Sequence, residues 1–369
     1  MRFAAILRQK FLFAIVSIGM APIAVTGFAS PASAQNEVET SSGVEEIDTD
    51  SLLDGPIDTP QDGTAPCNTN SGIDARLECG VNAIASGAFG TAIGADTLAS
   101  GSRSTALGND ADATATDATA LGADSVASGA QSLAVGESAI ADFTDAVAVG
   151  QSADVGGIGA VALGADANAA TAGAVSIGAQ SDATGSGSVA IGGDSNDGDT
   201  LGAQAAAFAT AVGADAVASS TNAVALGEGA EASGTSAMAL GTESDATGNN
   251  SIAIGTSADA SAVNSTVVGT DATATAENAT VVGQSAEATA EDSSAFGQNA
   301  EASAVNSVAV GTDATASGVT STALGQLATA TQDNTTAVGR FSRANGRNST
   351  ALGSGSNASA DSAVALGRS

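Results

Sequence analysis

The chain of 369 residues contains no histidine, tyrosine or tryptophan, and Lys10 is its only lysine. Acid–base catalysis near neutral pH usually draws on histidine, or on lysine or glutamate with a shifted pKa. The Ser, Thr, Asp and Glu residues that remain form no nucleophile elbow, phosphate-binding loop or metal-ligand cluster in the sequence. We therefore expect no enzymatic activity, no catalytic residue and no resident cofactor.

Basic residues are also scarce, because nine Lys and Arg stand against 40 Asp and Glu, a formal net charge of −31. A field of this sign repels phosphates, which excludes a nucleic-acid partner. Three of the nine basic residues, Arg340, Arg343 and Arg347, fall close together. They either relieve the local repulsion between carboxylates or form a small anion-binding patch.

Long hydrophobic runs are absent beyond the N-terminus. Residues 1–34 combine basic residues, an apolar stretch and the small-residue site Ala32-Ser33-Ala34, the pattern of a secretory signal peptide. The other reading is an N-terminal membrane anchor, but Gly19 and Pro22 interrupt the run, which is short for a membrane span. We expect an exported chain with no membrane-spanning segment in its mature part.

Residues 35–66 are rich in Asp, Glu and Pro and lack aromatic residues, which predicts an acidic, disordered leader. Cys67 and Cys79 follow as the only two cysteines. In an exported protein two such cysteines pair, and we expect their disulfide to cap the N-terminal end of the domain that follows, residues 67–369.

A fourteen-residue repeat organises that domain. The segment Asn250-Ser251-Ile252-Ala253-Ile254-Gly255 returns with its glycine at 269, 283, 297 and onward to 367, and backward to 94, with one interruption. Before each glycine, large and small residues alternate, which predicts a short β-strand. Glycines such as Gly94, Gly192, Gly255 and Gly311 mark turns. A second alternation completes the repeat, so we predict an all-β fold, a parallel β-roll or β-solenoid with two strands per turn.

The large residue before each glycine is predicted to form the core of the roll. We assign this core role to the following residues: Ile93, Leu107, Val135, Ile191, Leu226, Ile254, Val310 and Leu366. One large side chain per turn makes a thin core. Small residues such as Ala134, Ala253 and Ala309 are then predicted to lie on the opposite face, where they would let copies of the chain pack closely.

The interruption of the repeat lies between Gly192 and Gly213, where seven residues are added. The added segment contains Asp194, Asp197 and Asp199, and carboxylate-rich loops with glycine can hold calcium. The spacing differs from an EF-hand loop, so the alternative is an ordinary solvated loop. Calcium is the one metal that this loop suggests.

The repeat resembles the head repeat of trimeric autotransporter adhesins, the YadA-like head, whose signature reads N-S-V-A-I-G. The resemblance rests on Asn250 to Gly255, Asn306 to Gly311 and Ser188 to Gly192, and it covers residues 80–367. It implies a left-handed roll, a homotrimer, and display on a bacterial cell surface or at the outer membrane. It also implies adhesion to extracellular matrix, host cells or abiotic surfaces.

Two further hypotheses remain open at the level of sequence. The first is an ice-binding β-solenoid, against which stands the assignment of Thr266 and Thr280 to interior positions. The second is a structural surface filament without a specific receptor. The sequence shows no heptad-patterned stalk and no set of C-terminal anchor strands, so we expect either a part of a longer protein, or a protein that is released or held by a partner.

Overall fold

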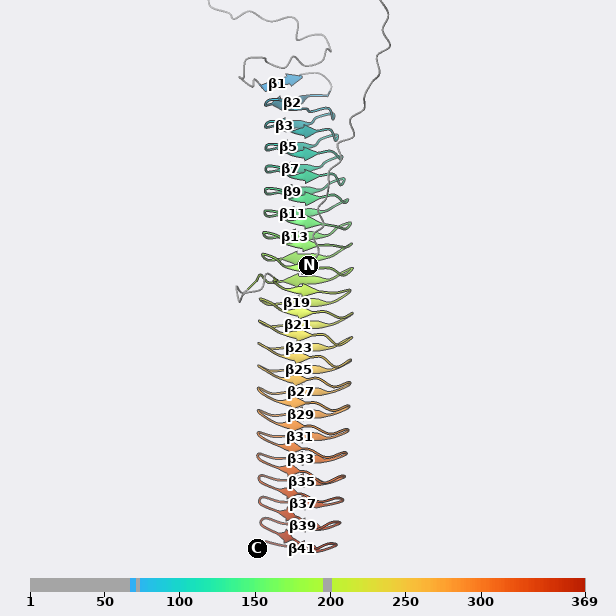
Figure 1. Ribbon diagram of the computed structural model, residues 1–369, viewed down its shortest axis with the longest axis vertical. Helices are drawn as coiled ribbons and strands as arrows, with labels where there is room; N and C mark the ends of the chain where they lie inside the picture. The colour runs from blue at the N-terminus through green and yellow to red at the C-terminus, as the bar shows by residue number, and fades with distance from the viewer. Residues whose placement is uncertain (1–66, 71–73, 195–200, 369) are drawn as a thin grey trace, which may run out of the picture. The chain divides into compact units, whose positions relative to one another are not determined.

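The computed structural model describes residues 67–70, 74–194 and 201–368 (Figure 1), and these form strands and turns with no helix. The signal peptide and the acidic leader predicted for residues 1–66 lie outside the described residues. Each fourteen-residue turn contains one long and one short strand, as in β25 (Ile252–Ile254) and β26 (Asp259–Ala260). The predicted all-β parallel solenoid is therefore confirmed.

The long strands pair in parallel, each with the long strand of the next turn. In β25 and β27, for example, Ile252 lies beside Thr266 and Ile254 beside Val268. The long strands of the repeat are β3 (Thr91–Ile93), β5 (Thr105–Leu107), β7 (Thr119–Leu121), β9 (Leu133–Val135), β11 (Val147–Val149), β13 (Val161–Leu163), β15 (Val175–Ile177), β17 (Val189–Ile191), β19 (Thr210–Val212), β21 (Val224–Leu226), β23 (Met238–Leu240), β25 (Ile252–Ile254), β27 (Thr266–Val268), β29 (Thr280–Val282), β31 (Ser294–Phe296), β33 (Val308–Val310), β35 (Thr322–Leu324), β37 (Thr336–Val338), β39 (Thr350–Leu352) and β41 (Val364–Leu366).

The short strands form a second parallel ladder on the other side of the roll, with Asp259 of β26 beside Thr273 of β28. They are β4 (Leu98–Ala99), β6 (Asp112–Ala113), β8 (Val126–Ala127), β10 (Ile140–Ala141), β12 (Asp154–Val155), β14 (Asn168–Ala169), β16 (Asp182–Ala183), β18 (Gln204–Ala205), β20 (Val217–Ala218), β22 (Glu231–Ala232), β24 (Asp245–Ala246), β26 (Asp259–Ala260), β28 (Thr273–Ala274), β30 (Glu287–Ala288), β32 (Glu301–Ala302), β34 (Thr315–Ala316), β36 (Thr329–Ala330), β38 (Arg343–Ala344) and β40 (Asn357–Ala358).

The N-terminal end of the solenoid is closed by a hairpin. Strand β1 (Cys67–Asn70) pairs antiparallel with β2 (Arg76–Cys79), which places Cys67 opposite Cys79, and the two cysteines form a disulfide bond. Glu78 occupies the inward position that alanine takes in later turns and is 7% exposed. Its carboxylate accepts a hydrogen bond from the backbone N–H of Ala85 at 2.7 Å. A buried donor at the end of the roll is thus satisfied by a side chain.

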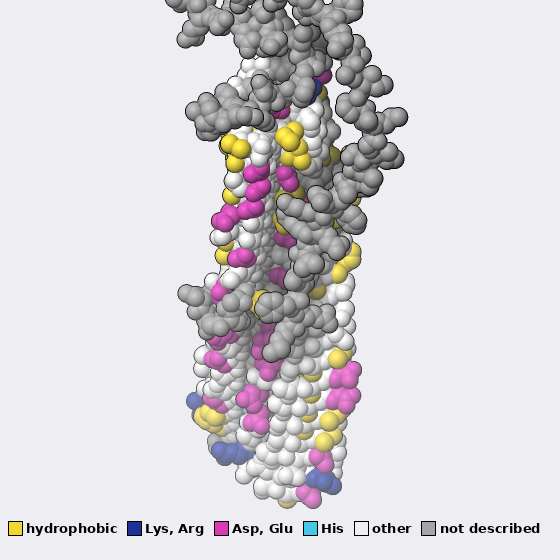
Figure 2. Space-filling view, turned by 45° about the horizontal axis from the view of Figure 1, so that its top comes forward, with side chains coloured by type: hydrophobic (Ala, Val, Ile, Leu, Met, Phe, Trp, Pro, Cys, Tyr) yellow, Lys and Arg dark blue, Asp and Glu magenta, His cyan; other side chains and the backbone are white. Residues whose placement is uncertain are grey.

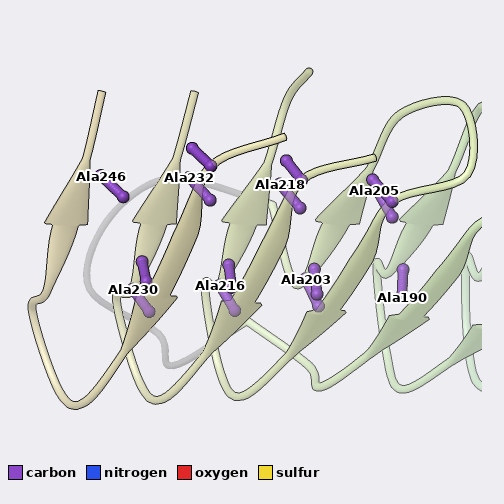
Figure 3. Close-up of a cluster of buried hydrophobic side chains, with 14 of the residues drawn as sticks. Ala190, Ala203, Ala205, Ala216, Ala218, Ala230, Ala232 and Ala246 are labelled. Atoms are coloured by element: carbon purple, nitrogen blue, oxygen red, sulfur yellow. The ribbon is translucent and has the colours of Figure 1, made fainter. Parts of the chain in front are cut away.

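The space between the two ladders is filled mainly by alanine, together with buried Ser and Thr residues at positions that directly precede strands. The middle residue of each long strand and the second residue of each short strand point inward, and nearly all of these are 0–2% exposed. Figure 3 shows Ala190, Ala203, Ala205, Ala216 and their neighbours projecting from the two ladders toward one another. Among the described side chains, the largest fully buried ones are Val155, Val267 and Val281. The interior therefore accepts nothing larger than valine.

The predicted core is wrong, and the two faces of the long strand are exchanged. The residues assigned to the core point outward: Ile93, Val135, Ile191, Leu226 and Val310 are half-buried, and Leu107, Ile254 and Leu366 are exposed. The residues assigned to contacts between copies, Ala134, Ala253 and Ala309, are 0% exposed inside the roll. Alternation determines which residues share a face but not which face turns inward, and two ladders closed by tight turns lie too near each other for leucine.

The repeat glycines are required by the turn that follows each long strand. Gly255 has φ +135°, and a Cβ atom there would lie 2.5 Å from the carbonyl oxygen of Gly269 in the next turn. Gly94, Gly192 and Gly311 also have positive φ, at 139°, 144° and 130°. Side chains with a Cβ are excluded by both the backbone angle and the close approach, as the sequence predicted.

Candidate functional site

No group of three His, Cys, Asp or Glu residues in the described ranges could hold a metal ion. Asp194 is described, whereas Asp197 and Asp199 lie outside the described residues. The calcium hypothesis for the added segment therefore stays a prediction.

The first surface consists of the outward side chains of the long strands, and we name it the apolar face. The parallel register stacks Ile254, Val268 and Val282 directly beside one another in three successive turns, about 4.8 Å apart. These three side chains are 37%, 36% and 40% exposed. Other exposed members are Leu107, Phe296, Leu324, Leu352 and Leu366. Apolar ladders of this length on a surface mark sites of association.

Threonines alternate with aliphatic residues on the same apolar face. Thr266 and Thr280 occupy the first position of β27 and β29, and both are half-buried on the outer side. The prediction that these threonines lie in the interior is wrong for the same reason as the core assignment. The signal that could have prevented both errors is the small size of the middle residue, since only the inner position must exclude large side chains.

The second surface is formed by the first residue of each short strand, and we name it the acidic face. Its carboxylates are Asp112, Asp154, Asp182, Glu231, Asp245, Asp259, Glu287 and Glu301. Glu231, Asp245 and Asp259 lie beside one another in successive strands. Partial burial, followed by the charges of Glu231, Asp259 and Glu243, raises the pKa of Asp245.

Two other carboxylates of the acidic face are perturbed in the same direction. Burial raises the pKa of Asp154, with a smaller contribution from the charge of Asp142. Burial also raises the pKa of Asp182, although a hydrogen bond from Asn168 at 2.8 Å opposes the shift. Desolvation and like charges both disfavour ionisation, so the folded chain disfavours the charged form of these three carboxylates.

Cations relieve this field at only a few described places. Arg103 donates two hydrogen bonds to Asp117, and the pKa of the Asp117 carboxyl is lowered mainly by these bonds. Figure 2 shows carboxylates spread over the visible turns and a group of Arg side chains near one end. Arg340, Arg343 and Arg347, which belong to one turn close to the C-terminal end, are all exposed.

The corner of the roll that precedes each long strand carries a ladder of amide side chains. Asn250 donates to Asn264, Asn264 to Asn278, and Asn278 to the carboxylate of Asp292, at 3.3, 3.2 and 3.1 Å. Asn250, Asn264 and Asn278 have φ between 56° and 57°, a left-handed conformation that asparagine tolerates better than most residues. The ladder stabilises the stack of turns and offers no unpaired reactive group.

Within the part of the chain that the structure describes, no helix is long and apolar enough to cross a membrane. Each candidate surface repeats over many turns. Such surfaces suit contact with another extended molecule.

Comparison with known proteins agrees with this geometry. The family model "YadA head domain repeat (2 copies)" matches residues 99–125, 127–153, 156–181, 172–195, 201–230, 232–258, 260–286, 288–314, 316–342 and 344–369. A solved structure of the collagen-binding domain of the Yersinia adhesin YadA is 21% identical, over 58% of this chain and 68% of that chain. The TM-score between the two structures is 0.16. No curated protein matches.

The family model matches well over half of the chain, in successive pairs of turns. Its repeat coincides with the unit seen in the structure, in which one long strand, a glycine turn and one short strand recur. The chain therefore belongs to the YadA head repeat family and is an adhesin-type head.

Proposed function

We propose that the chain is the head of a homotrimeric surface adhesin, in which three copies pack through their apolar faces. The observation that carries this proposal is the ladder of outward aliphatic side chains, such as Ile254, Val268 and Val282, which are 36–40% exposed in the single chain. Burial of an apolar ladder stabilises association. The family supports the number of three copies, and the exposed aliphatic side chains of the single chain support the apolar face as the interface between them.

The interface is tested by placing charge on the apolar face. In the variant Ile254→Asp/Val268→Asp, each trimer would bury six carboxylates in two adjacent turns, so we expect it to dissociate or fail to assemble. The matched control is Thr273→Asp/Thr315→Asp on the acidic face, which adds the same charge and should remain trimeric. Sedimentation velocity gives the oligomeric state. A monomeric wild-type chain, or equal behaviour of the two variants, contradicts the proposed interface.

The adhesive role concerns attachment of the bacterial cell to matrix, host-cell or environmental surfaces. The family and the predicted signal peptide support export of the chain and its display at the cell surface. Many weak contacts along a multivalent head give strong overall attachment. Beads coated with the chain should be retained under flow on at least one such surface, and beads coated with a monomeric variant should be retained less. Absence of retention on all of them favours a structural filament without a receptor.

Ice binding is a second candidate, because the structure places threonines on the outer side of the roll. Thr322, Thr336 and Thr350 lie beside one another in three successive turns of the apolar face. A flat, regular ladder of hydroxyl and methyl groups can order water. Trimer formation and ice binding require the same face, so measurable thermal hysteresis by a monomeric chain would replace the adhesin proposal.

A further inference from the structure

One region of the rod reverses the charge of the rest. Residues 314–360 contain three arginines, Arg340, Arg343 and Arg347, and a single carboxylate, Asp333, in a chain with 40 acidic and nine basic residues. We name this region the cationic band. On the acidic face, the nearest carboxylate that precedes Arg343 of β38 is Glu301 of β32. It lies three short strands away, or about 14 Å at the spacing between strands.

The three arginines belong to one turn of the solenoid, so their backbone positions follow one another across the rod rather than along it. Arg340 follows Gly339 at the glycine turn, Arg343 begins the short strand β38, and Arg347 lies at the opposite corner of the same turn of the solenoid. Arg340 and Arg343 are three residues apart, a backbone distance of at most about 10 Å. A linear molecule that crosses the rod at a right angle would therefore contact all three in order.

At the glycine turn, an apolar surface lies beside Arg340. The Nε atom of Arg340 donates to Oε1 of Gln326 at 3.0 Å, and its guanidinium group lies 4.4 Å from the centre of the Phe341 ring. Phe341 and Leu327 stand at left-handed positions, with φ of 59° and 57°, and are 36% and 37% exposed. One turn before Leu327, the corresponding position is occupied by Asp313. The same left-handed angle recurs at corners along the whole solenoid, for example at Phe89 and Phe208, so what distinguishes this corner is its two apolar side chains beside Arg340.

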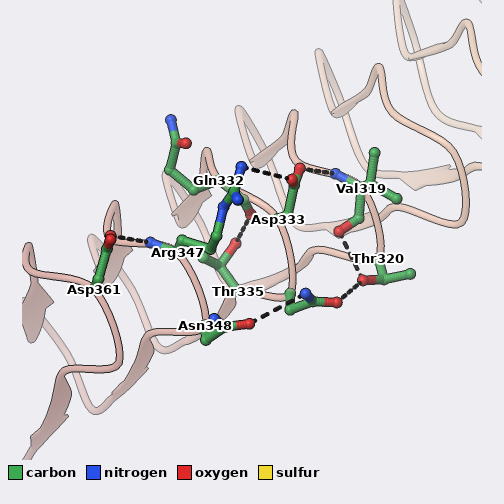
Figure 4. A network of polar contacts seen from close by, with 9 residues as sticks. Val319, Thr320, Gln332, Asp333, Thr335, Arg347, Asn348 and Asp361 are labelled. Carbon is green, nitrogen blue, oxygen red and sulfur yellow. Dashed lines mark hydrogen bonds and ion pairs between the residues drawn. The ribbon is translucent and has the colours of Figure 1, made fainter.

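At the other corner Arg347 is held in place without being covered. Its Nη2 atom lies 3.2 Å from Oδ2 of Asp333, yet its side chain remains 60% exposed. Its backbone N–H donates to Asp361 at 2.9 Å (Figure 4). Between the two corners, Arg343 is exposed and lies beside Thr329 and Asn357 in the register of the short strands. The cationic band therefore presents guanidinium, hydroxyl and amide donors together.

We propose that the cationic band binds a sulfated polysaccharide chain laid across the rod. Guanidinium groups recognise oxyanions such as sulfate by paired hydrogen bonds. Thr329 and Asn357 can bond to sugar hydroxyls, and Phe341 with Leu327 offers an apolar surface to the C–H face of a sugar ring. This inference rests on the proposed adhesin function, because it names the class of surface molecule that the head would contact.

The charge pattern favours a thin polyanion over a broad anionic surface. A membrane or a large acidic protein laid along the rod would meet Glu301, Glu287 and the carboxylates beyond them, and would be repelled. Exposed charges more than about 8 Å apart are largely screened at physiological salt. A narrow chain confined to the cationic band therefore avoids the carboxylates of the acidic face and meets Asp333 and Asp361 only beside Arg347.

The test uses the full chain and heparin as the sulfated probe, by isothermal titration calorimetry at about 0.15 M NaCl. We expect binding that weakens as salt increases, and an affinity about tenfold lower in Arg340→Gln/Arg343→Gln/Arg347→Gln. The matched control, Arg76→Gln/Arg103→Gln/Arg368→Gln, has the same net charge, since six basic minus 40 acidic residues gives −34, and should keep the wild-type affinity. The variant Arg340→Lys/Arg343→Lys/Arg347→Lys keeps the positive charges and removes the guanidinium groups, which separates the two contributions to binding. Thermal melts verify that each variant is folded.

Three results would overturn the inference: no binding of heparin by the wild-type chain, equal losses in the two Gln triple variants, or competition by polyglutamate as strong as that by heparin. The last result would indicate an acidic polypeptide as the partner. Retention of coated beads on surfaces without sulfated sugars separates this inference from the adhesin proposal. If the Gln triple variant of the cationic band no longer binds heparin but beads coated with it are still retained on surfaces without sulfated sugars, heparin binding and adhesion are independent. A wild-type head that adheres without binding heparin contradicts only the inference about the cationic band.

Discussion

The inward position of the long strands should be the part of the sequence most sensitive to added volume. Ala309 is 0% exposed, and so are Ala295 and Ala323, its neighbours in the register of the long strands. No described residue larger than valine is fully buried in the interior. Ala309→Leu adds three carbon atoms where no neighbour can shrink, so we expect a loss of about 1–3 kcal/mol in the free energy of unfolding. This corresponds to a decrease in Tm of roughly 2–10 °C.

The assay is urea denaturation followed by circular dichroism, with a calorimetric melt as a second measure. The control is Val310→Leu, one residue away on the apolar face, where the side chain is half-buried in the single chain and an added methylene adds no volume to the interior of the roll. Measurement at several protein concentrations separates folding from assembly, because only association depends on concentration. If Ala309→Leu is as stable as Val310→Leu, the assignment of alanine to the interior and of valine to the exterior is wrong.

Three further predictions concern the turn, the acidic face and the net charge. Gly255→Ala should lower the free energy of unfolding by about 1–3 kcal/mol, because its Cβ atom would lie 2.5 Å from the Gly269 oxygen. The control Gly173→Ala, whose Cβ atom would meet nothing within 4 Å, should lower it less. Equal losses of the two variants in urea denaturation would contradict the close approach at Gly255. Asp245→Asn should raise the Tm slightly at pH 7. The raised pKa of Asp245 means that protonation stabilises the folded state; this stability is fully present below the ordinary value of 3.8 and is lost as pH rises through the folded pKa. The advantage of the Asn variant should therefore disappear below about pH 3.8, and a benefit that persists there would refute the electrostatic cause. The Tm of the wild-type chain, with its net charge of −31, should increase with NaCl because salt screens repulsion between carboxylates; a flat or falling Tm opposes this account.

A calcium effect on the Tm larger than that of NaCl at equal ionic strength would support a cation site at Asp194, Asp197 and Asp199. An effect of the same size would identify the added segment as a solvated loop.

Much of the fold follows from the sequence by itself. The fourteen-residue period and the alternation around Ala253 predict strands that recur in register, because parallel stacking repeats every contact at the same interval. The glycines at 94, 192, 255 and 311 mark the turns, since only glycine tolerates the backbone angle found there. The position of Cys67 and Cys79 likewise indicates where the repeat begins.

Only the tertiary structure decided which side of each strand is the inside. The two-residue alternation is compatible with either Ile254 or Ala253 pointing inward. Hydrophobicity alone favours the arrangement in which Ile254 points inward. The closeness of the two ladders selects alanine and places the aliphatic ladder on the outer surface, where it is available to other copies. The three arginines are close in the sequence, but their alignment across one turn depends on the path of the chain around the roll. Spacing along the chain cannot show that alignment, because it depends on where each corner directs its side chains.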